Sequence, residues 1–183
     1  MQNAANFLIQ AILGLALYIV LLRFWMQWVR ADFRNEIGQF IITVTNPIVI
    51  PLRKVLPSIG TIDTATVVLA LAVGAVKIFA YLTIIGHSAG LADYAVMTIG
   101  VVIKSSIYLF CAAIIVGIIA SWINPHSYHP VLGVARSIGE PLLAPARKLI
   151  PSVARLDFSP MVVLLLLQGS LYIVWEYLLP IPV

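Results

Sequence analysis

Residues 47–58 read PIVIPLRKVLPS, and residues 141–152 read PLLAPARKLIPS, the same pattern 94 positions later. The match extends without a gap over residues 28–63 and 122–157, with eight identities in 36 positions. Ordinary composition would give about two or three by chance. The identical pairs are Trp28/Trp122, Pro47/Pro141, Pro51/Pro145, Arg53/Arg147, Lys54/Lys148, Pro57/Pro151, Ser58/Ser152 and Asp63/Asp157. Most are not hydrophobic, so the match predicts a tandem duplication built around a polar, proline-rich loop.

The composition is that of a membrane protein. Hydrophobic residues make up 62% of the chain and charged residues 10%, whereas soluble domains average about 45–50% and 25%. Crossing about 30 Å of hydrocarbon takes about 20 apolar residues, and four windows qualify: residues 7–29, 64–85, 95–123 and 160–179. The sequence therefore predicts an all-α membrane protein with two spans in each repeat, residues 1–93 and 94–183. Because two spans return the chain to its starting side, the repeats are expected to be parallel.

The positive charges predict the orientation in the membrane. Residues 30–63 and 124–157 contain most of the Lys and Arg of the chain, whereas the two ends and residues 86–94 contain none. By the positive-inside rule, both long loops are expected in the cytoplasm and both termini outside. The net charge of +4 then belongs to the inner side and predicts contact with anionic lipid headgroups. The sequence lacks the interleaved aromatic and basic residues that are typical of nucleic-acid binding, so no nucleic-acid partner is expected.

Each loop is expected to begin with a short amphipathic helix at the membrane interface. Apolar residues recur at helical spacing, as Ile37, Phe40, Ile41 and Val44 and again as Val131, Val134, Ala135 and Ile138. The prolines that follow lack an amide donor and disfavour helix in the preceding residue, so a proline-broken backbone is predicted. Such a backbone forms either a re-entrant turn or an interfacial hairpin. The paired cations in each loop favour the interfacial alternative, because charges are costly at depth.

Asp63 and Asp157 end the two loops, each directly before an apolar span. One interpretation is a helix cap, which Ser159 and Pro160 support at the start of the fourth span. The other pairs each aspartate with the Arg-Lys step of its own loop, giving two equivalent charge clusters at the cytoplasmic ends of the second and fourth spans. Both can hold together.

Four polar residues are predicted to lie within the spans: Lys77, Lys104, Gln168 and Glu176. Lys77 lies 14 residues after Asp63, or about 21 Å along a helix. An ionisable residue at that depth is a functional candidate, with snorkelling or pairing to Gln168 or Glu176 as the alternatives. Counted along their helices, Lys104 lies about 27 Å from Trp122 and Glu176 about 28 Å from Asp157. Both are therefore at a similar height, and they are expected to form a pair near the outer surface.

The second copy of the motif resembles a known family. Residues 141–152 followed by Leu156-Asp157-Phe158-Ser159-Pro160 are similar to the signature of the YggT (YlmG) family of small bacterial and plastid membrane proteins. The resemblance covers nearly the whole chain, but the first copy has Asp63-Thr64-Ala65-Thr66 where the second has the Ser-Pro step. The resemblance implies a protein of the bacterial inner membrane linked to osmotic-shock tolerance or ion uptake. It assigns no catalytic residues.

Three classes of function follow from these patterns. A membrane scaffold or assembly factor would use the two loops to dock a cytoplasmic or membrane protein partner, and this class is favoured. An ion channel or transporter component would need a homo-oligomer, with Lys77, Gln168 or the Pro-Arg loops lining the pore. An enzyme is not expected, because no base, nucleophile or metal constellation is present in the sequence. No cofactor or metal is expected either.

Overall fold

The computed structural model describes residues 2–123, 129–150 and 157–179. The regular elements of these ranges are helices, in the order α1 (Gln2–Trp28), α2 (Glu36–Val55), α3 (Thr64–Ile85), α4 (Leu91–Ile123), α5 (Pro130–Leu149) and α6 (Ser159–Tyr177). Four of them are long and apolar enough to cross a membrane: α1 over Ala4–Trp28, α3, α4 over Leu91–Ser121, and α6. The predicted all-α fold and its four spans are confirmed to within a few residues.

The same three-helix packing occurs in both halves of the chain. α2 and α5 each have 20 residues and begin 94 positions apart, the offset of the sequence repeat. Within the first half α1, α2 and α3 contact one another, and within the second half α4, α5 and α6 do the same. The halves meet mainly through α3 and α4, with further contacts of α1 to α4 and α5 and of α2 to α5. The fold is thus a duplicated span, loop helix and span.

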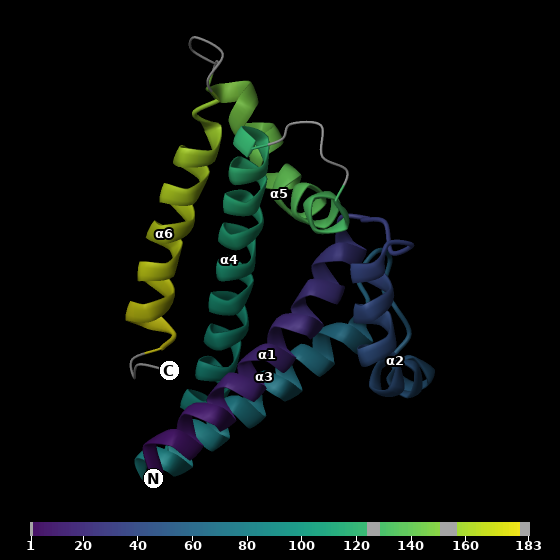
Figure 1. The fold of residues 1–183 in the computed structure, drawn as a ribbon. Coiled ribbons are helices and arrows are strands. Elements are labelled where there is room, and N and C mark those ends of the chain that lie inside the picture. Colours follow the sequence, from purple (N-terminus) through teal and green to yellow (C-terminus); the bar gives the residue numbers. More distant parts are fainter. Residues whose placement is uncertain (1, 124–128, 151–156, 180–183) are drawn as a thin grey trace.

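The two span pairs are inclined to one another (Figure 1). The start of α1 and the end of α6 lie toward the bottom of the view, whereas α5 lies at the top. α3 ends at Ile85, and Gly86 caps it in the left-handed conformation, with a φ of 68° and with its amide donating to the Leu82 and Thr83 carbonyls. Glycine adopts this conformation without strain, so the chain turns sharply into α4.

The starts of the two loop helices are fixed by local capping. The Asn35 side chain accepts a hydrogen bond of 2.8 Å from the Gly38 amide at the start of α2. A Cβ at Gly38 would stand 2.6 Å from Phe33 Cα, so only glycine allows the preceding loop to pack this closely. α5 begins instead with His129 as its cap and Pro130 in its first turn, a position where proline costs no hydrogen bond.

The prolines do not break the loop helices, so that prediction was wrong. α2 continues through Pro47 and Pro51, and α5 through Pro141 and Pro145. The two prolines of each helix are four residues apart and exposed, so they share one outward face. The carbonyls that lose their donors therefore lie on the outside of a helix whose inner face is packed. A helix can bend around such a face without losing its buried contacts.

Each loop helix packs one face on the spans, but the exposed faces of the two helices differ in polarity. α2 buries Ile41 and Val49 and leaves Phe40, Val44 and Ile48 exposed, so the predicted apolar stripe is only partly the buried one. α5 buries the predicted Val134, Ala135 and Ile138, while Val131 is exposed. Its outer face is polar, with Arg136, Glu140, Arg147 and Lys148 exposed. The first loop therefore presents an apolar surface and the second a charged one.

Candidate functional site

The C-terminal end of α2 brings Arg53 next to Asp63. After Val55 the chain makes a tight turn in which Ile59 and Ile62 exchange backbone hydrogen bonds of 3.0 and 3.1 Å. Gly60 has a φ of 61° in this turn, a conformation that favours glycine. The turn reverses the chain, and α3 then begins directly after Asp63.

The first cluster comprises Gln27, Arg53, Asp63 and Thr66, together with Arg23. Arg53 Nη2 lies 2.6 Å from Asp63 Oδ2, and Nε lies 3.3 Å from Oδ1, a two-pronged ion pair. Nη2 also donates to Gln27 Oε1 at 3.3 Å, and the Thr66 hydroxyl donates to Asp63. The Asp63 side chain is only 1% exposed. Burial alone would raise the pKa of Asp63, but the hydrogen bonds from Arg53 and Thr66 outweigh it and lower that pKa.

Arg23 is a residue that the sequence reasoning missed. It lies on α1 with 5% of its surface exposed, and Nη1 donates to the Thr45 hydroxyl and to Asn46 Oδ1, the latter at 2.9 Å. It thereby ties the first span to the middle of α2. An arginine inside a predicted apolar span costs free energy unless it is hydrogen-bonded. Its presence in the first span could therefore have predicted polar partners for it.

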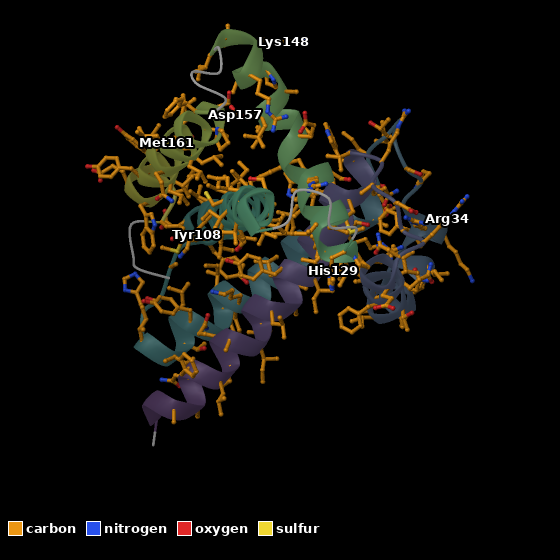
Figure 2. The ribbon with its side chains drawn as sticks, turned by 45° about the horizontal axis from the view of Figure 1, so that its top comes forward. Arg34, Tyr108, His129, Lys148, Asp157 and Met161 are labelled. Carbon is orange, nitrogen blue, oxygen red and sulfur yellow. The ribbon has the colours of Figure 1, made fainter. Side chains whose placement is uncertain are left out.

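The second cluster comprises Glu140, Arg147 and Asp157. Arg147 Nε donates to Asp157 Oδ2 at 2.9 Å, and Nη1 donates to both Glu140 oxygens at 2.9 and 3.0 Å. Asp157 Oδ1 accepts the Ser159 amide at 2.9 Å. Burial raises the pKa of Asp157, but the hydrogen bonds from Arg147 and Ser159 outweigh it and lower that pKa. The Asp157 side chain is 39% exposed, whereas that of Asp63 is 1% exposed, so the aspartate is open to solvent in the second cluster and buried in the first. Lys148 and Asp157 lie toward the same end of the molecule (Figure 2).

The predicted pairing of each aspartate with the arginine of its own loop is confirmed by these ion pairs. Asp157 stands one residue before Phe158, the cap residue of α6, and its Oδ1 accepts the amide of Ser159, the first residue of that helix. Asp63 stands at the cap position of α3 but makes no such bond, because Arg53 and the Thr66 hydroxyl occupy its carboxylate. In both copies the ion pair is present, and in neither does the aspartate side chain make a capping bond from the cap position of the next helix.

The two clusters carry opposite formal charge. The first has two arginines and one aspartate, and the second has one arginine and two carboxylates. The difference comes from two positions, since Arg23 and Asn46 stand where the second repeat has Gly117 and Glu140. Equivalent positions in the two loops are therefore chemically different.

The remaining predicted loop residues lie around these clusters. Lys54 and Lys148 are exposed in the last turns of α2 and α5, and Pro57 is exposed after α2. Pro151 lies outside the described residues. Ser159 and Pro160 are buried at the start of α6. Among the atoms that the structure describes, the Ser159 hydroxyl has no hydrogen-bond partner.

The four polar residues of the spans do not have the neighbours that the sequence predicted for them. Lys77 and Lys104 line one pocket between α1, α3 and α4, while Gln168 and Glu176 are exposed on α6. In the described part of the chain α3 does not contact α6, so the alternative that pairs Lys77 with Gln168 or Glu176 was wrong. The ion pairs of the described ranges do not include Lys104 with Glu176. The Lys104 ammonium instead lies 4.2 Å from the centroid of the Trp175 ring.

Comparisons with known proteins agree with the two-copy architecture. The profile of the CCB3/YggT family matches residues 2–84 and again residues 96–178. An uncharacterized protein of Pseudomonas aeruginosa is 39% identical over 92% of this chain and 86% of its own length. An uncharacterized protein from the proC 3′ region of Vibrio alginolyticus is 34% identical over 98% of both chains.

The protein YggT of Escherichia coli K12 is 33% identical over 91% of this chain and 86% of its own length. No solved structure matches the chain. The family profile matches each repeat from its first span to its second, with the ion-paired loop between them. This chain belongs to the CCB3/YggT family.

Proposed function

We propose that this protein is a non-enzymatic scaffold of the bacterial inner membrane that docks a protein partner on its cytoplasmic loops. The observation that carries the proposal is the duplicated ion pair. In both repeats an arginine in the last turn of the loop helix is bonded to the aspartate that precedes the next span. Each loop helix is thereby fixed to the bundle at its C-terminal end. A preorganised surface binds a partner with less loss of conformational entropy than a flexible loop does.

The outer face of α5 is the proposed docking surface. It exposes Arg136, Glu140 and Lys148, charged groups that give orientation and specificity to an encounter. The outer face of α2 is apolar around Phe40 and Val44, which suits contact with lipid at the interface. In this proposal both loops are cytoplasmic, both termini are outside, and Lys54 and Lys148 also meet anionic headgroups.

A photo-crosslinking residue at Ser137, on α5, tests the docking surface. We expect a discrete crosslinked partner in cells, which is lost when Arg136→Gln and Lys148→Gln are added. Ser88, in the outer turn, is the matched control position and should not give that product. Growth after osmotic shock is the cellular readout, because the family resemblance implies a role in osmotic tolerance. Wild-type crosslinking and growth in the charge-neutralised variant would contradict the proposal.

Ion conduction by an oligomer is the second candidate function, and the pocket that contains Lys77 and Lys104 favours it. Against it stands another pocket, of about 360 Å³ between the two span pairs, whose described lining is apolar apart from Ser106 and the indole N–H of Trp25. Ion flux in proteoliposomes separates the two functions. Robust flux that changes selectivity in Lys77→Met would favour the channel, and a scaffold should show none.

A further inference from the structure

The contact between the two repeats is made on one side of the chain and left open on the other. Gly74 of α3 lies against α4, where a Cβ would stand 3.0 Å from Val102 Cγ2 and 3.3 Å from Val101 Cγ1. The second span of one repeat thus packs on the first span of the next. α6 is the second span of the last repeat, and in the described ranges it contacts α4 and α5 but not α1. It lies at one edge of the bundle, on the far side of α4 from α1 (Figure 1).

The face of α6 that corresponds to this contact is exposed. Three residues of α3 that lie beside α4, each with its counterpart 94 positions later, are Val67/Met161, Leu71/Leu165 and Gly74/Gln168. Gly74 is buried, whereas Gln168 is exposed. Leu71 is 36% exposed, whereas Leu165 is 74% exposed. A face that α4 covers in the first repeat is therefore uncovered in the second.

The corresponding face of α1 is exposed as well. The α4 residues that lie closest to Gly74, each with its counterpart on α1, are Thr98/Ala4, Val101/Phe7 and Val102/Leu8. Val101 is 1% exposed, whereas Phe7 is 71% and Leu8 is 57% exposed. The chain therefore carries both sides of a contact that it already makes once, one side on its first span and the other on its last.

Two residues on the open face of α6 favour a protein neighbour over lipid. Gln168 lies nine residues after Ser159 and nine before Tyr177, in the middle of the span. Its side chain makes no hydrogen bond within the described part of the chain, and an amide at that depth has no water to bond to, so it favours a hydrogen bond to another helix. A Cβ at the next residue, Gly169, would meet nothing within 4 Å. A small residue beside a polar one lets a second helix approach closely.

We infer that copies of this protein associate side by side in the membrane, with α6 of one copy packed on α1 of the next. This contact repeats between chains the one that α3 makes with α4 within the chain. The Thr98 carbonyl oxygen would stand 3.6 Å from a Cβ at Gly74, so the corresponding acceptor for the Gln168 amide is the backbone carbonyl of Ala4 on the second copy. The contact joins two different surfaces, so it propagates into a ring or a row instead of ending at a dimer. The inference does not rest on the docking function proposed for α5.

Cysteine cross-linking in a Cys111→Ala background tests the contact. Gln168→Cys and Leu8→Cys are introduced into two full-length chains that carry different tags, and membranes from cells that express both are oxidised with copper phenanthroline. We expect a cross-linked dimer that carries both tags. Each variant expressed alone should remain a monomer after oxidation. A chain with both substitutions should give a ladder of dimers, trimers and larger products, because a heterologous contact propagates.

Ile173→Cys is the matched control on α6. Ile173 is 58% exposed, and its counterpart Phe79 on α3 is 61% exposed, so this face is not covered in the first repeat either. Ile173→Cys should therefore not cross-link to Leu8→Cys. A dimer formed by Gln168→Cys alone would indicate a symmetric contact between two α6 helices and would overturn the inference.

Energy transfer between copies in liposomes measures the association without a cross-link. Donor and acceptor dyes are attached at Ser88→Cys, in the outer turn, again in the Cys111→Ala background. We expect more transfer than between randomly mixed copies, and less of it as lipid is added. Gln168→Leu keeps an apolar side chain of similar size and removes the hydrogen bond, so it should weaken association by about threefold to thirtyfold, while Ile173→Leu should associate as the parent does. Transfer no higher than random mixing, transfer unchanged by Gln168→Leu, or transfer without the mixed-tag cross-link would overturn the inference.

Discussion

Asp63→Asn should destabilise the protein much more than the equivalent change Asp157→Asn. Asp63 is 1% exposed, and Asp63→Asn removes the negative charge that Arg53 and the buried Arg23 share within the described cluster. Breaking a buried pair costs about 3–5 kcal/mol. Because the Arg53 side chain is 42% exposed, we reduce this to about 2–3 kcal/mol.

Asp157→Asn removes a much weaker interaction. The side chains of Asp157 and Arg147 are 39% and 44% exposed, and such exposed pairs contribute about 0–1 kcal/mol. An asparagine at this position can still accept the Ser159 amide, because its side-chain carbonyl oxygen is also an acceptor. Glu140 also remains bonded to Arg147. The expected cost of Asp157→Asn is therefore below about 1 kcal/mol.

Reversible unfolding in mixed maltoside and dodecyl sulfate micelles, followed by far-ultraviolet circular dichroism, measures both changes. Asp32→Asn, an exposed loop aspartate, is the control for loss of one negative charge. We expect the midpoint of Asp63→Asn to shift clearly to lower dodecyl sulfate and that of Asp157→Asn to stay near the control. Equal shifts in the two variants would refute the argument, because burial would then not decide the strength of the pair.

Three further predictions concern orientation, coupling and pH. In a Cys111→Ala background, a cysteine at Ser58 should resist impermeant thiol reagents in intact cells and one at Ser88 should react; labelling of Ser58 from outside would reverse the proposed orientation. Arg147→Gln and Asp157→Asn should impair partner docking similarly and non-additively, and full docking in Asp157→Asn would leave the cap as its sufficient role. Both cluster aspartates have lowered pKa values in the folded protein. They therefore add stability that is present above the unfolded pKa of about 4 and is lost as the pH falls through the folded pKa values. An unfolding midpoint that is constant from neutral pH to below pH ~3 would contradict this.

The spans and the duplication were predictable because each depends on local information. A window of about 20 apolar residues has few alternatives to a membrane helix, and identical Pro, Arg and Asp at one spacing identify a repeat. The ion pairs were predictable for the same reason, since a loop of ten residues brings Arg53 back to Asp63. These features need no knowledge of the neighbouring helices.

The parts that the sequence did not predict depend on tertiary context. The prolines of α2 were expected to break the chain, but their effect depends on which face is packed, and that face is set by α1 and α3. Arg23 looked like part of an apolar span because its acceptors, Thr45 and Asn46, lie 22 and 23 positions away. Lys104 was paired with Glu176 by height alone, although helix rotation directs it to the ring of Trp175.

The opposite formal charges of the two clusters do not make one repeat more basic than the other. Residues 23–63 and 117–157 each sum to +2. In the first, Asp32 and Glu36 offset Arg30 and Arg34, whereas in the second Arg136 and Arg155 have no such offset. The two loops therefore attract anionic headgroups equally in total but hold their charge in different places. A chain assembled from two copies of the second repeat would keep the net charge of the loops and all four spans, and would carry two negative clusters in place of one of each sign.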